Sequence, residues 1–355
     1  MSDYLQIESL GKSFDGVQVL DGIDLTLTRG ECLVLLGGSG CGKTTLLNIV
    51  AGLLRPDTGR VRLEQQTLDE PASGHHVPAR KRRFGMVFQD FSLWPNMSVA
   101  QNVEFGLKMQ GLAVKDRRER VGQALEQVRM SAFADAAPGQ LSGGQQQRVA
   151  IARAMAVRPR VVLFDEPLSA LDARLRETLR DELAGLIREH NMTAIYVTHD
   201  QLEAYSLADR IALMSSGRIA QLDKPEALYM RPASRYVAEF LGAANLFAYQ
   251  RRAEALHLSD GLSLPPPTLD VPESGHLVIH RDRVRIDAAN TECGDANLIR
   301  LHGVCRSQTY LGERHEVFAE AADGLVFRGF SGQRFRQGEP VSIGFQPHDL
   351  HCVAQ

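Results

Sequence analysis

Apolar and polar residues follow two different periods along the first 240 residues. The mostly apolar runs at 32–36, 161–164 and 193–197 have the length of buried strands, whereas 23–27 alternates like a strand with one exposed face. Residues 99–137 have a helical period, and a later helix carries one apolar face formed by Leu171, Leu175, Leu179, Leu183 and Leu186. This mixture predicts an α/β domain that spans residues 1–240.

The pattern changes beyond residue 241. Short alternating segments, separated by Gly and Pro, occur at 275–286, 299–304, 315–318, 325–330 and 341–345. This arrangement is typical of a small OB-like barrel made only of strands. We therefore predict a second, all-β domain over residues 241–355.

The glycine-rich run Gly37–Thr45 fits the phosphate-loop pattern G-x-x-x-x-G-K-[ST]. It lies between a predicted buried strand and a predicted helix, which is the context that the motif requires. The glycines let backbone N–H groups face one centre, and the start of the helix adds partial positive charge. Lys43 would reach the β- and γ-phosphates, and the Thr44 hydroxyl would coordinate Mg²⁺. The alternative, a glycine-rich turn without a ligand, fits this placement less well.

Polar residues follow three other predicted strands. Asp165 and Glu166 end one strand, where Asp165 suits Mg²⁺ and Glu166 could orient or deprotonate a water molecule. His199 follows another and could contact a γ-phosphate, although a lone histidine is more often structural. Gln89 follows a third and could ligate Mg²⁺ or position water through its amide oxygen.

Two further features are candidates for nucleotide contacts. Leu141–Gln145 places Ser142 as a helix N-cap, before paired glycines whose N–H groups are open to an anion. Phe14 is either a core residue or a ring that stacks on adenine, and the pattern leaves both interpretations open. The apolar residues at 91–95 are likewise either subdomain core or an exposed docking patch.

Composition narrows the class of protein. The net charge of −3 disfavours a general nucleic-acid binder, and no apolar run approaches the ~20 residues of a membrane span. The start of the chain lacks the pattern of a signal peptide. We interpret 65–80 as surface loop and the basic run at 80–83 as a solvated face. The cysteines form no C-x-x-C pair, which predicts reduced thiols and no zinc site, and they are Cys32, Cys41, Cys293, Cys305 and Cys352.

In this order, the motifs closely resemble those of an ATP-binding-cassette (ABC) transporter ATPase over residues 4–240. The resemblance implies a P-loop NTPase domain with a helical subdomain near 90–157, in which Leu141–Gln145 is the signature. The implied ATP-binding residues are Phe14, Gly37, Gly38, Ser39, Gly40, Cys41, Gly42, Lys43, Thr44, Thr45, Ser142, Gly143, Gly144, Gln145 and Asp172. Catalysis is implied for Glu166, His199, Lys43 and Gln89, and Mg²⁺ binding for Thr44, Gln89 and Asp165. Gly38 departs from many relatives, which have proline there.

The C-terminal part resembles the TOBE-type regulatory domain of bacterial importer ATPases of the maltose, polyamine, ferric-ion, sulfate and aminophosphonate group, with a similar junction at 232–242. This resemblance implies that two copies sandwich ATP with Mg²⁺ at the cytoplasmic face of the plasma membrane. There they would drive two transmembrane permease subunits, which receive solute from a periplasmic or lipid-anchored binding protein. Residues 91–95 would then lie near the permease, and no nucleic acid is expected.

Two other classes of protein share parts of this pattern. A soluble ABC ATPase acting on DNA or ribosomes would have the same motifs, although such proteins usually carry coiled-coil inserts or two cassettes. A phosphate-loop kinase would lack the Leu141–Gln145 signature. The C-terminal domain could also be an interaction module without a regulatory role. The transported solute would be selected by the permease and the binding protein, so this sequence does not identify it.

Overall fold

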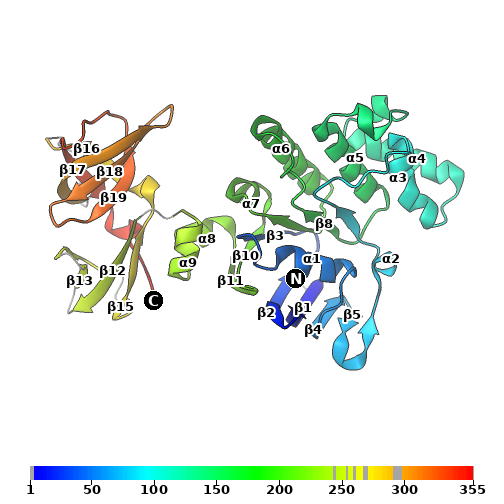
Figure 1. Ribbon diagram of the computed structural model, residues 1–355, viewed down its shortest axis with the longest axis horizontal. Coiled ribbons are helices and arrows are strands. Elements are labelled where there is room, and N and C mark those ends of the chain that lie inside the picture. The colour runs from blue at the N-terminus through cyan, green and yellow to red at the C-terminus, as the bar shows by residue number, and fades with distance from the viewer. Residues whose placement is uncertain are drawn as a thin grey trace. The chain divides into compact units, whose positions relative to one another are not determined.

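The computed structural model describes residues 4–242, 245–252, 255–258, 261–266, 271–290 and 298–354. The chain divides into two compact units, Met1–Pro225 and Glu226–Gln355 (Figure 1). The first is the predicted α/β domain and the second contains the predicted strands. Each unit has a hydrophobic core of its own.

A six-stranded sheet forms the centre of the first unit, in the order β11-β10-β3-β9-β8-β7. Its five parallel strands are β10 (Arg210–Ser215), β3 (Cys32–Gly37), β9 (Ala194–Thr198), β8 (Val162–Asp165) and β7 (Gly85–Val87). The edge strand β11 (Arg218–Asp223) runs antiparallel to β10. Every residue of β3 is buried, as expected for a strand covered on both faces. The parallel arrangement places the carboxyl ends of the central strands at one edge of the sheet.

A second, antiparallel sheet has the order β2-β1-β4-β5-β6. Its strands are β2 (Val17–Leu27), β1 (Leu5–Phe14), β4 (Thr58–Leu63), β5 (Gln66–Glu70) and β6 (His75–His76). Side chains from this sheet, from the central sheet and from α1 (Lys43–Ala51) share one core. The prediction of surface loop over 65–80 is wrong, because β5 and β6 extend the sheet and bury Leu68.

Arg82 also corrects the sequence analysis, which placed the whole basic run on a solvated face. Its side chain is buried beside helix α2 (Ala79–Arg82). The guanidinium donates to Asp69 Oδ2 at 2.5 Å and to the carbonyl oxygens of Ile49 and Val50 at 2.8 and 2.9 Å. The last two carbonyls belong to the final turn of α1, where the Ile49 oxygen also accepts from the Gly52 N–H at the helix cap. Arg82 therefore fastens the C-terminal end of the helix that follows the glycine-rich loop.

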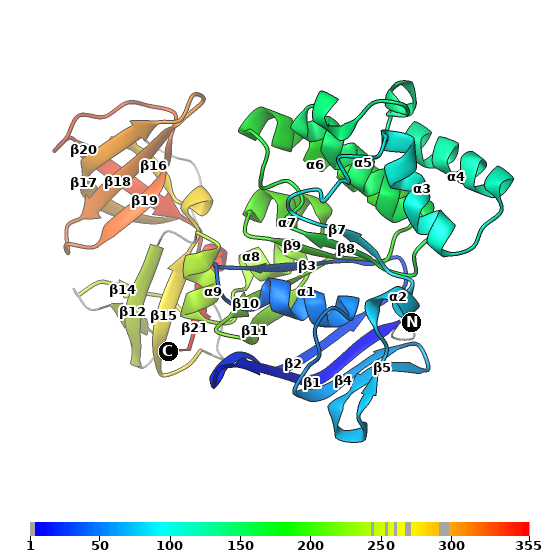
Figure 2. The ribbon, with the colours of Figure 1, turned by 45° about the vertical axis from the view of Figure 1, so that its right-hand side comes forward.

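Three helices pack together in the predicted helical subdomain: α3 (Val99–Met109), α4 (Val114–Gln127) and α5 (Gly143–Ala156). Figure 2 shows them grouped beyond the edge of the central sheet that ends in β7. The helical pattern predicted over 99–137 stops at Gln127, and short 3₁₀ turns follow at Ser131–Phe133 and Pro138–Gln140. Helices α6 (Ala173–Glu189) and α7 (Gln201–Leu207) complete the unit.

The second unit begins with helices α8 (Pro225–Met230) and α9 (Arg235–Phe240). A five-stranded sheet follows, in the order β14-β13-β12-β15-β21. Its strands are β12 (Asn245–Arg252), β13 (Ala255–Leu258), β14 (Ser263–Leu264), β15 (Ser274–Ile279) and β21 (His351–Val353). Ala238 of α9 packs on Val278 and Val353 of this sheet. The compact unit therefore starts before residue 240, and the boundary that we drew at 240 stays a prediction.

A closed barrel completes the second unit, and it confirms the predicted all-β character. Its strands are β16 (Arg285–Ala288), β17 (Ile299–Tyr310), β18 (His315–Ala321), β19 (Val326–Ser331) and β20 (Pro340–Phe345). The predicted single segment 275–286 is wrong in one respect. The 3₁₀ turn Arg281–Arg283 divides it into β15 of the open sheet and β16 of the barrel.

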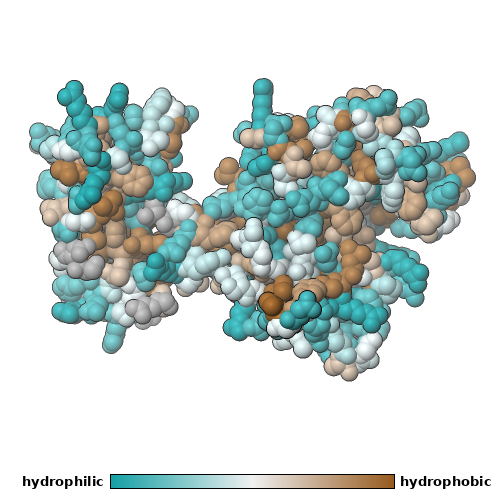
Figure 3. Space-filling view, viewed as in Figure 1, coloured by the Kyte–Doolittle hydropathy of each residue, from teal (hydrophilic) through white to brown (hydrophobic). Residues whose placement is uncertain are grey.

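Hydrophilic residues cover most of the visible face of both units (Figure 3). Among the described residues, no helix is both long and apolar enough to span a membrane.

Cys32, Cys41, Cys305 and Cys352 carry free thiols. Cys293 lies outside the described residues.

Candidate active site

The glycine-rich loop connects β3 to α1, as the motif predicts. Gly40 and Gly42 have φ values of 77° and 101°, a left-handed region that side chains with a Cβ rarely adopt. A Cβ on Gly42 would also approach Leu20 Cδ2 at 2.7 Å and Val19 O at 2.8 Å. Both backbone geometry and space therefore require glycine where the loop enters the helix.

Lys43 lies inside this loop, with only 5% of its surface exposed. Its Nζ donates to the carbonyl oxygens of Gly37 at 2.8 Å and Gly38 at 3.0 Å, and it lies 3.8 Å from Cys41 Sγ. Within the part of the chain that the structure describes, no carboxylate lies within ion-pair distance of this ammonium group. Its positive charge is left available to an anion in the loop.

Thr44 and Asp165 meet at the carboxyl edge of the central sheet. The Thr44 hydroxyl donates to Asp165 Oδ1 at 3.0 Å. Burial raises the pKa of Asp165, and the nearby Glu166 charge raises it further, while the Thr44 hydrogen bond and Lys43 oppose the shift. A hydroxyl and a carboxylate oxygen held side by side form a donor set that suits a hard divalent cation.

Glu166 and His199 come from the ends of the adjacent strands β8 and β9. His199 Nδ1 lies 3.1 Å from Glu166 Oε2. The Glu166 backbone has φ 43°, and the residue is held by its N–H bond to Val197 O and by the Ser169 hydroxyl on its carbonyl oxygen. Left-handed backbone at a residue other than glycine carries strain, which is often found at functional sites. The His199 side chain is 56% exposed, so the pair is open to solvent.

Sequence reasoning missed two acidic residues that support this edge. Asp200 caps α7 by accepting from the N–H groups of Leu202 and Glu203 at 2.7 and 3.1 Å. Glu203 is buried and accepts from the hydroxyls of Tyr196 and Thr198, each at 2.8 Å. Because Thr198 directly precedes His199, Glu203 fixes the strand end that carries the histidine. The sequence does contain the pattern. Tyr196 and Thr198 are polar residues two positions apart on a predicted buried strand, and Glu203 lies one helical turn after Asp200.

The signature residues and Asp172 form helix caps. The Ser142 hydroxyl accepts from the Gln145 N–H at 3.4 Å, and Gln145 Oε1 accepts from the Ser142 N–H at 2.9 Å. Asp172 caps α6 by accepting from the Leu175 N–H at 3.0 Å. A Cβ on Gly144 would lie 3.0 Å from the Leu175 side chain, so glycine lets α5 pack closely on α6. Among the described residues, no hydrogen bond links these groups to the glycine-rich loop.

Two further predicted residues, Gln89 and Phe14, lie on the surface. Gln89 is exposed just beyond β7. Phe14, at the end of β1, is 43% exposed, and Lys12 Nζ lies 5.2 Å from its ring centre. This exposure rules out the interpretation of Phe14 as a core residue. Its stacking on adenine stays a prediction.

Comparison with known proteins agrees with this geometry. The family model "ABC transporter" matches residues 20–169, and the model "TOBE domain" matches residues 277–353. An "Fe(3+) ions import ATP-binding protein FbpC" of Escherichia coli strain K12 is 44% identical, over 99% of this chain and 98% of that protein. A "Spermidine/putrescine import ATP-binding protein PotA" of Pseudomonas aeruginosa strain UCBPP-PA14 is 42% identical, over 90% of this chain and 88% of that protein.

A solved structure is also similar to the first unit. It is described as a dimeric structure of a post-hydrolysis state of the ATP-binding cassette MJ0796 bound to ADP and Pi, with a TM-score of 0.54 and 33% identity. The likeness covers 62% of this chain and 98% of that one. The predicted fold class, a P-loop ATPase domain followed by a TOBE-type all-β domain, is thereby confirmed. The chain belongs to the ABC transporter family, as an ATPase subunit with a C-terminal TOBE domain.

Proposed function

We propose that this chain powers the import of a solute by hydrolysing ATP with Mg²⁺ at the carboxyl edge of its central sheet. One observation carries the proposal. The buried, unpaired ammonium of Lys43, the Thr44–Asp165 contact and the Glu166–His199 pair come from separate elements and meet at the same edge. The relatives named as import ATP-binding proteins support the direction of transport.

The residues divide the chemistry among them. Lys43 and the loop N–H groups would bind the β- and γ-phosphates, and Phe14 would stack on adenine. Thr44, Asp165 and Gln89 would hold Mg²⁺, which supplies positive charge at the phosphate oxygens when bound. Glu166 Oε2 would accept a proton from the attacking water.

His199 orients that carboxylate. With a proton on Nδ1, the ring would donate to Glu166 Oε2 across the observed 3.1 Å, and a contact of Nε2 with the γ-phosphate would require a proton on that nitrogen as well. Asp200 caps α7, and Glu203 of this helix accepts from the Thr198 hydroxyl, so these contacts hold the backbone next to the exposed His199 ring.

The signature is assigned to a second copy. In this proposal each nucleotide lies between the glycine-rich loop of one copy and Ser142–Gln145 of the other, together with Asp172. Support comes from the capped N-terminus of α5, whose N–H groups and paired glycines suit a phosphate but are not bonded to their own loop. The related cassette described as dimeric agrees with this arrangement.

The partners follow from the same reading. The chain would bind two transmembrane permease subunits, which would receive solute from a periplasmic or lipid-anchored binding protein. This contact would hold the chain at the cytoplasmic face of the plasma membrane. Contact with the permease is assigned to 91–95, where Trp94 is 36% exposed and the Arg153 guanidinium lies 5.2 Å from its ring centre.

The test measures phosphate release from MgATP by the purified chain, alone and with co-expressed permease subunits. Lys43→Ala should abolish nucleotide binding and hydrolysis, whereas Lys108→Ala, at an exposed site on α3, should leave both unchanged. Co-purification with membrane permeases supports import. Co-purification with ribosomes or DNA in place of permeases would contradict it and favour the soluble ABC class.

A further inference from the structure

A cavity lies at the amino-terminal end of the central strands, opposite the end that carries the candidate active site. It has a volume of about 470 Å³. Val162, the first residue of β8, and Thr193, just before β9, line it, whereas Asp165 ends β8 and His199 follows β9. Because a strand rises about 3.3 Å per residue, these ends are on the order of 10 Å apart along β8. Nothing in the proposed ATPase mechanism uses this cavity.

The cavity concentrates positive charge. Its lining includes Arg29, Arg120, Arg158, Arg160 and His190, and none of its lining residues is acidic. The chain as a whole has a net charge of −3, so this lining has the opposite sign to the protein. Of the four arginines, Arg160 pairs with Glu64 at 2.5 Å. Within the described ranges, no carboxylate lies within ion-pair distance of the other three guanidinium groups.

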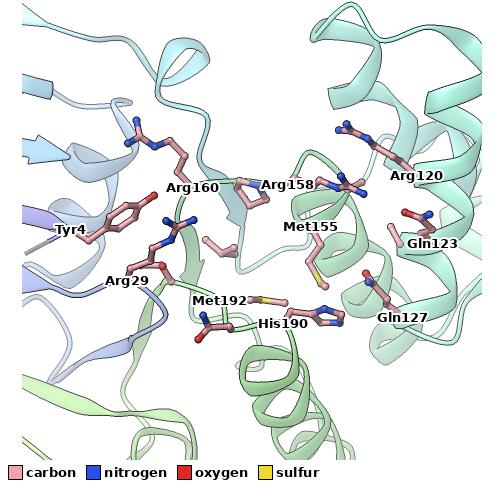
Figure 4. Close-up of a pocket in the computed structure, with 16 residues that line it drawn as sticks. Tyr4, Arg29, Arg120, Gln123, Gln127, Met155, Arg158, Arg160, His190 and Met192 are labelled. Atoms are coloured by element: carbon pink, nitrogen blue, oxygen red, sulfur yellow. The ribbon is translucent and has the colours of Figure 1, made fainter. Parts of the chain in front are cut away.

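The four arginines lie on two sides of the cavity, and the Arg160 side chain extends away from the helical side (Figure 4). Arg29, in the turn before β3, and Arg160, before β8, lie on the side of the sheets. Arg120 of α4 and Arg158, just after α5, lie on the side of the helices. A multiply charged anion could therefore contact both sides at once. Guanidinium groups suit this task because their planar fork matches a carboxylate or a phosphate.

The floor between the arginines is less polar. Tyr4 is buried, and its ring centre lies 5.9 Å from the guanidinium carbons of both Arg29 and Arg160. Met155 and Met192 also line the cavity, from the end of α5 and the start of β9. Guanidinium groups that line a cavity of several hundred Å³, beside a few apolar side chains, suit a small anion better than an apolar ligand.

We propose that this cavity binds a small organic anion with two or three carboxylate or phosphate groups. Arg120 and Arg158 hold one charged group from the helical side, and Arg29 and Arg160 hold another from the side of the sheets. Binding bridges α4 and α5 to the amino edge of the central sheet. The site is separate from the glycine-rich loop and needs no nucleotide.

Isothermal titration calorimetry of the full chain without nucleotide tests the proposal. The probes are citrate, for carboxylates, and 3-phosphoglycerate, for phosphate esters, with uncharged glycerol as the blank. We expect saturable binding of at least one anion, at one site per chain. Arg120→Gln/Arg158→Gln should weaken it by at least about tenfold, because two charge-assisted contacts are lost. Arg29→Gln, in an exposed turn, should also weaken anion binding. This single variant replaces the double variant in the test if the double variant does not fold.

Two controls separate this site from others. Arg55→Gln/Arg118→Gln removes the same charge from exposed positions outside the cavity and should leave affinity within about twofold. Lys43→Ala removes the cation of the glycine-rich loop and should also leave it unchanged. Equal affinity in the two double variants, no saturable binding of either anion, or loss of binding in Lys43→Ala would each overturn the proposal. ATP hydrolysis is measured in a separate experiment. The proposed ATPase function and the proposed anion site can therefore each be contradicted without the other.

Discussion

At the scale of single residues, Glu166 combines a strained backbone with a side chain that is 21% exposed. Its left-handed backbone is held by Val197 and Ser169, and its carboxylate meets His199 at 3.1 Å. If the side chain at this position had no function, replacement by glycine would stabilise the protein, because glycine adopts the same backbone conformation without strain. The carboxylate at this position is therefore best explained by its chemistry.

Glu166→Gln keeps the side-chain shape and removes the charge. If Glu166 accepts the proton of the attacking water, ATP hydrolysis should fall by about 10²–10⁴-fold while ATP binding survives. Phosphate release and equilibrium nucleotide binding, measured on the same preparation, separate the two effects. Glu126→Gln, at an exposed position on α4, should retain wild-type turnover. Wild-type turnover in Glu166→Gln would exclude this role.

At the scale of elements, the sequence places most of the predicted site residues at strand ends, because each follows an apolar run. The ends of β3, β8 and β9 follow from those runs, and parallel pairing brings Thr44, Asp165, Glu166 and His199 to one edge. A local pattern thus suffices for residues whose position is set by a strand end. A local pattern does not predict what the signature residues contact, because their proposed partners belong to another copy of the chain.

The elements that were missed are stabilised by distant contacts. Strand β5 is short and mostly polar, and its two buried residues, Leu68 and Asp69, are consecutive. The strand therefore lacks a clear alternation of apolar and polar residues. Arg82 resembles part of an exposed basic run because its partners, Asp69, Val50 and Ile49, lie 13, 32 and 33 residues before it in the sequence. The turn Arg281–Arg283 contains no Gly or Pro, so the change from β15 to β16 lacks the usual signal.

The Asp69–Arg82 pair gives a test of how these elements depend on one another. Both side chains are buried, and Asp69→Ala would leave the guanidinium charged without its partner. We expect a loss of stability of about 3–5 kcal/mol, because an uncompensated buried charge is costly. Thermal and urea unfolding followed by circular dichroism measure it. Glu104→Ala, which breaks the partly exposed pair with Arg117, should cost about 0–1 kcal/mol. Equal effects of the two substitutions would contradict the buried role.

At the scale of the whole molecule, the nucleotide motifs and the C-terminal unit are separable. Every predicted ATP contact lies before Pro225, and each compact unit has its own core. A chain ending at Gly242 should therefore still bind ATP, with affinity within a few-fold of the full chain. Equilibrium binding of a fluorescent ATP analogue measures this, and circular dichroism establishes that the shortened chain is folded. Loss of binding by a folded truncated chain would contradict the predicted boundary near 240.

Assembly gives the last prediction, since the signature lies apart from the glycine-rich loop of its own chain. Glu166→Gln removes a negative charge beside the γ-phosphate, which should favour the closed, ATP-filled pair. With MgATP this variant should therefore elute as a dimer in size-exclusion chromatography with light scattering. Without nucleotide it should elute as a monomer.

Adding Gly143→Asp to Glu166→Gln should disperse that dimer. Gly143 is the first residue of α5, so the new carboxylate would face phosphate across the interface and repel it. Binding of ATP to the chain's own Lys43 loop should persist, because no hydrogen bond among the described residues connects the two motifs. Gly122→Asp, on exposed α4, introduces the same charge far from the signature and should leave the dimer intact. If the Gly143→Asp variant still dimerises with MgATP, the phosphate is not shared between two chains, and each nucleotide is held by one copy alone.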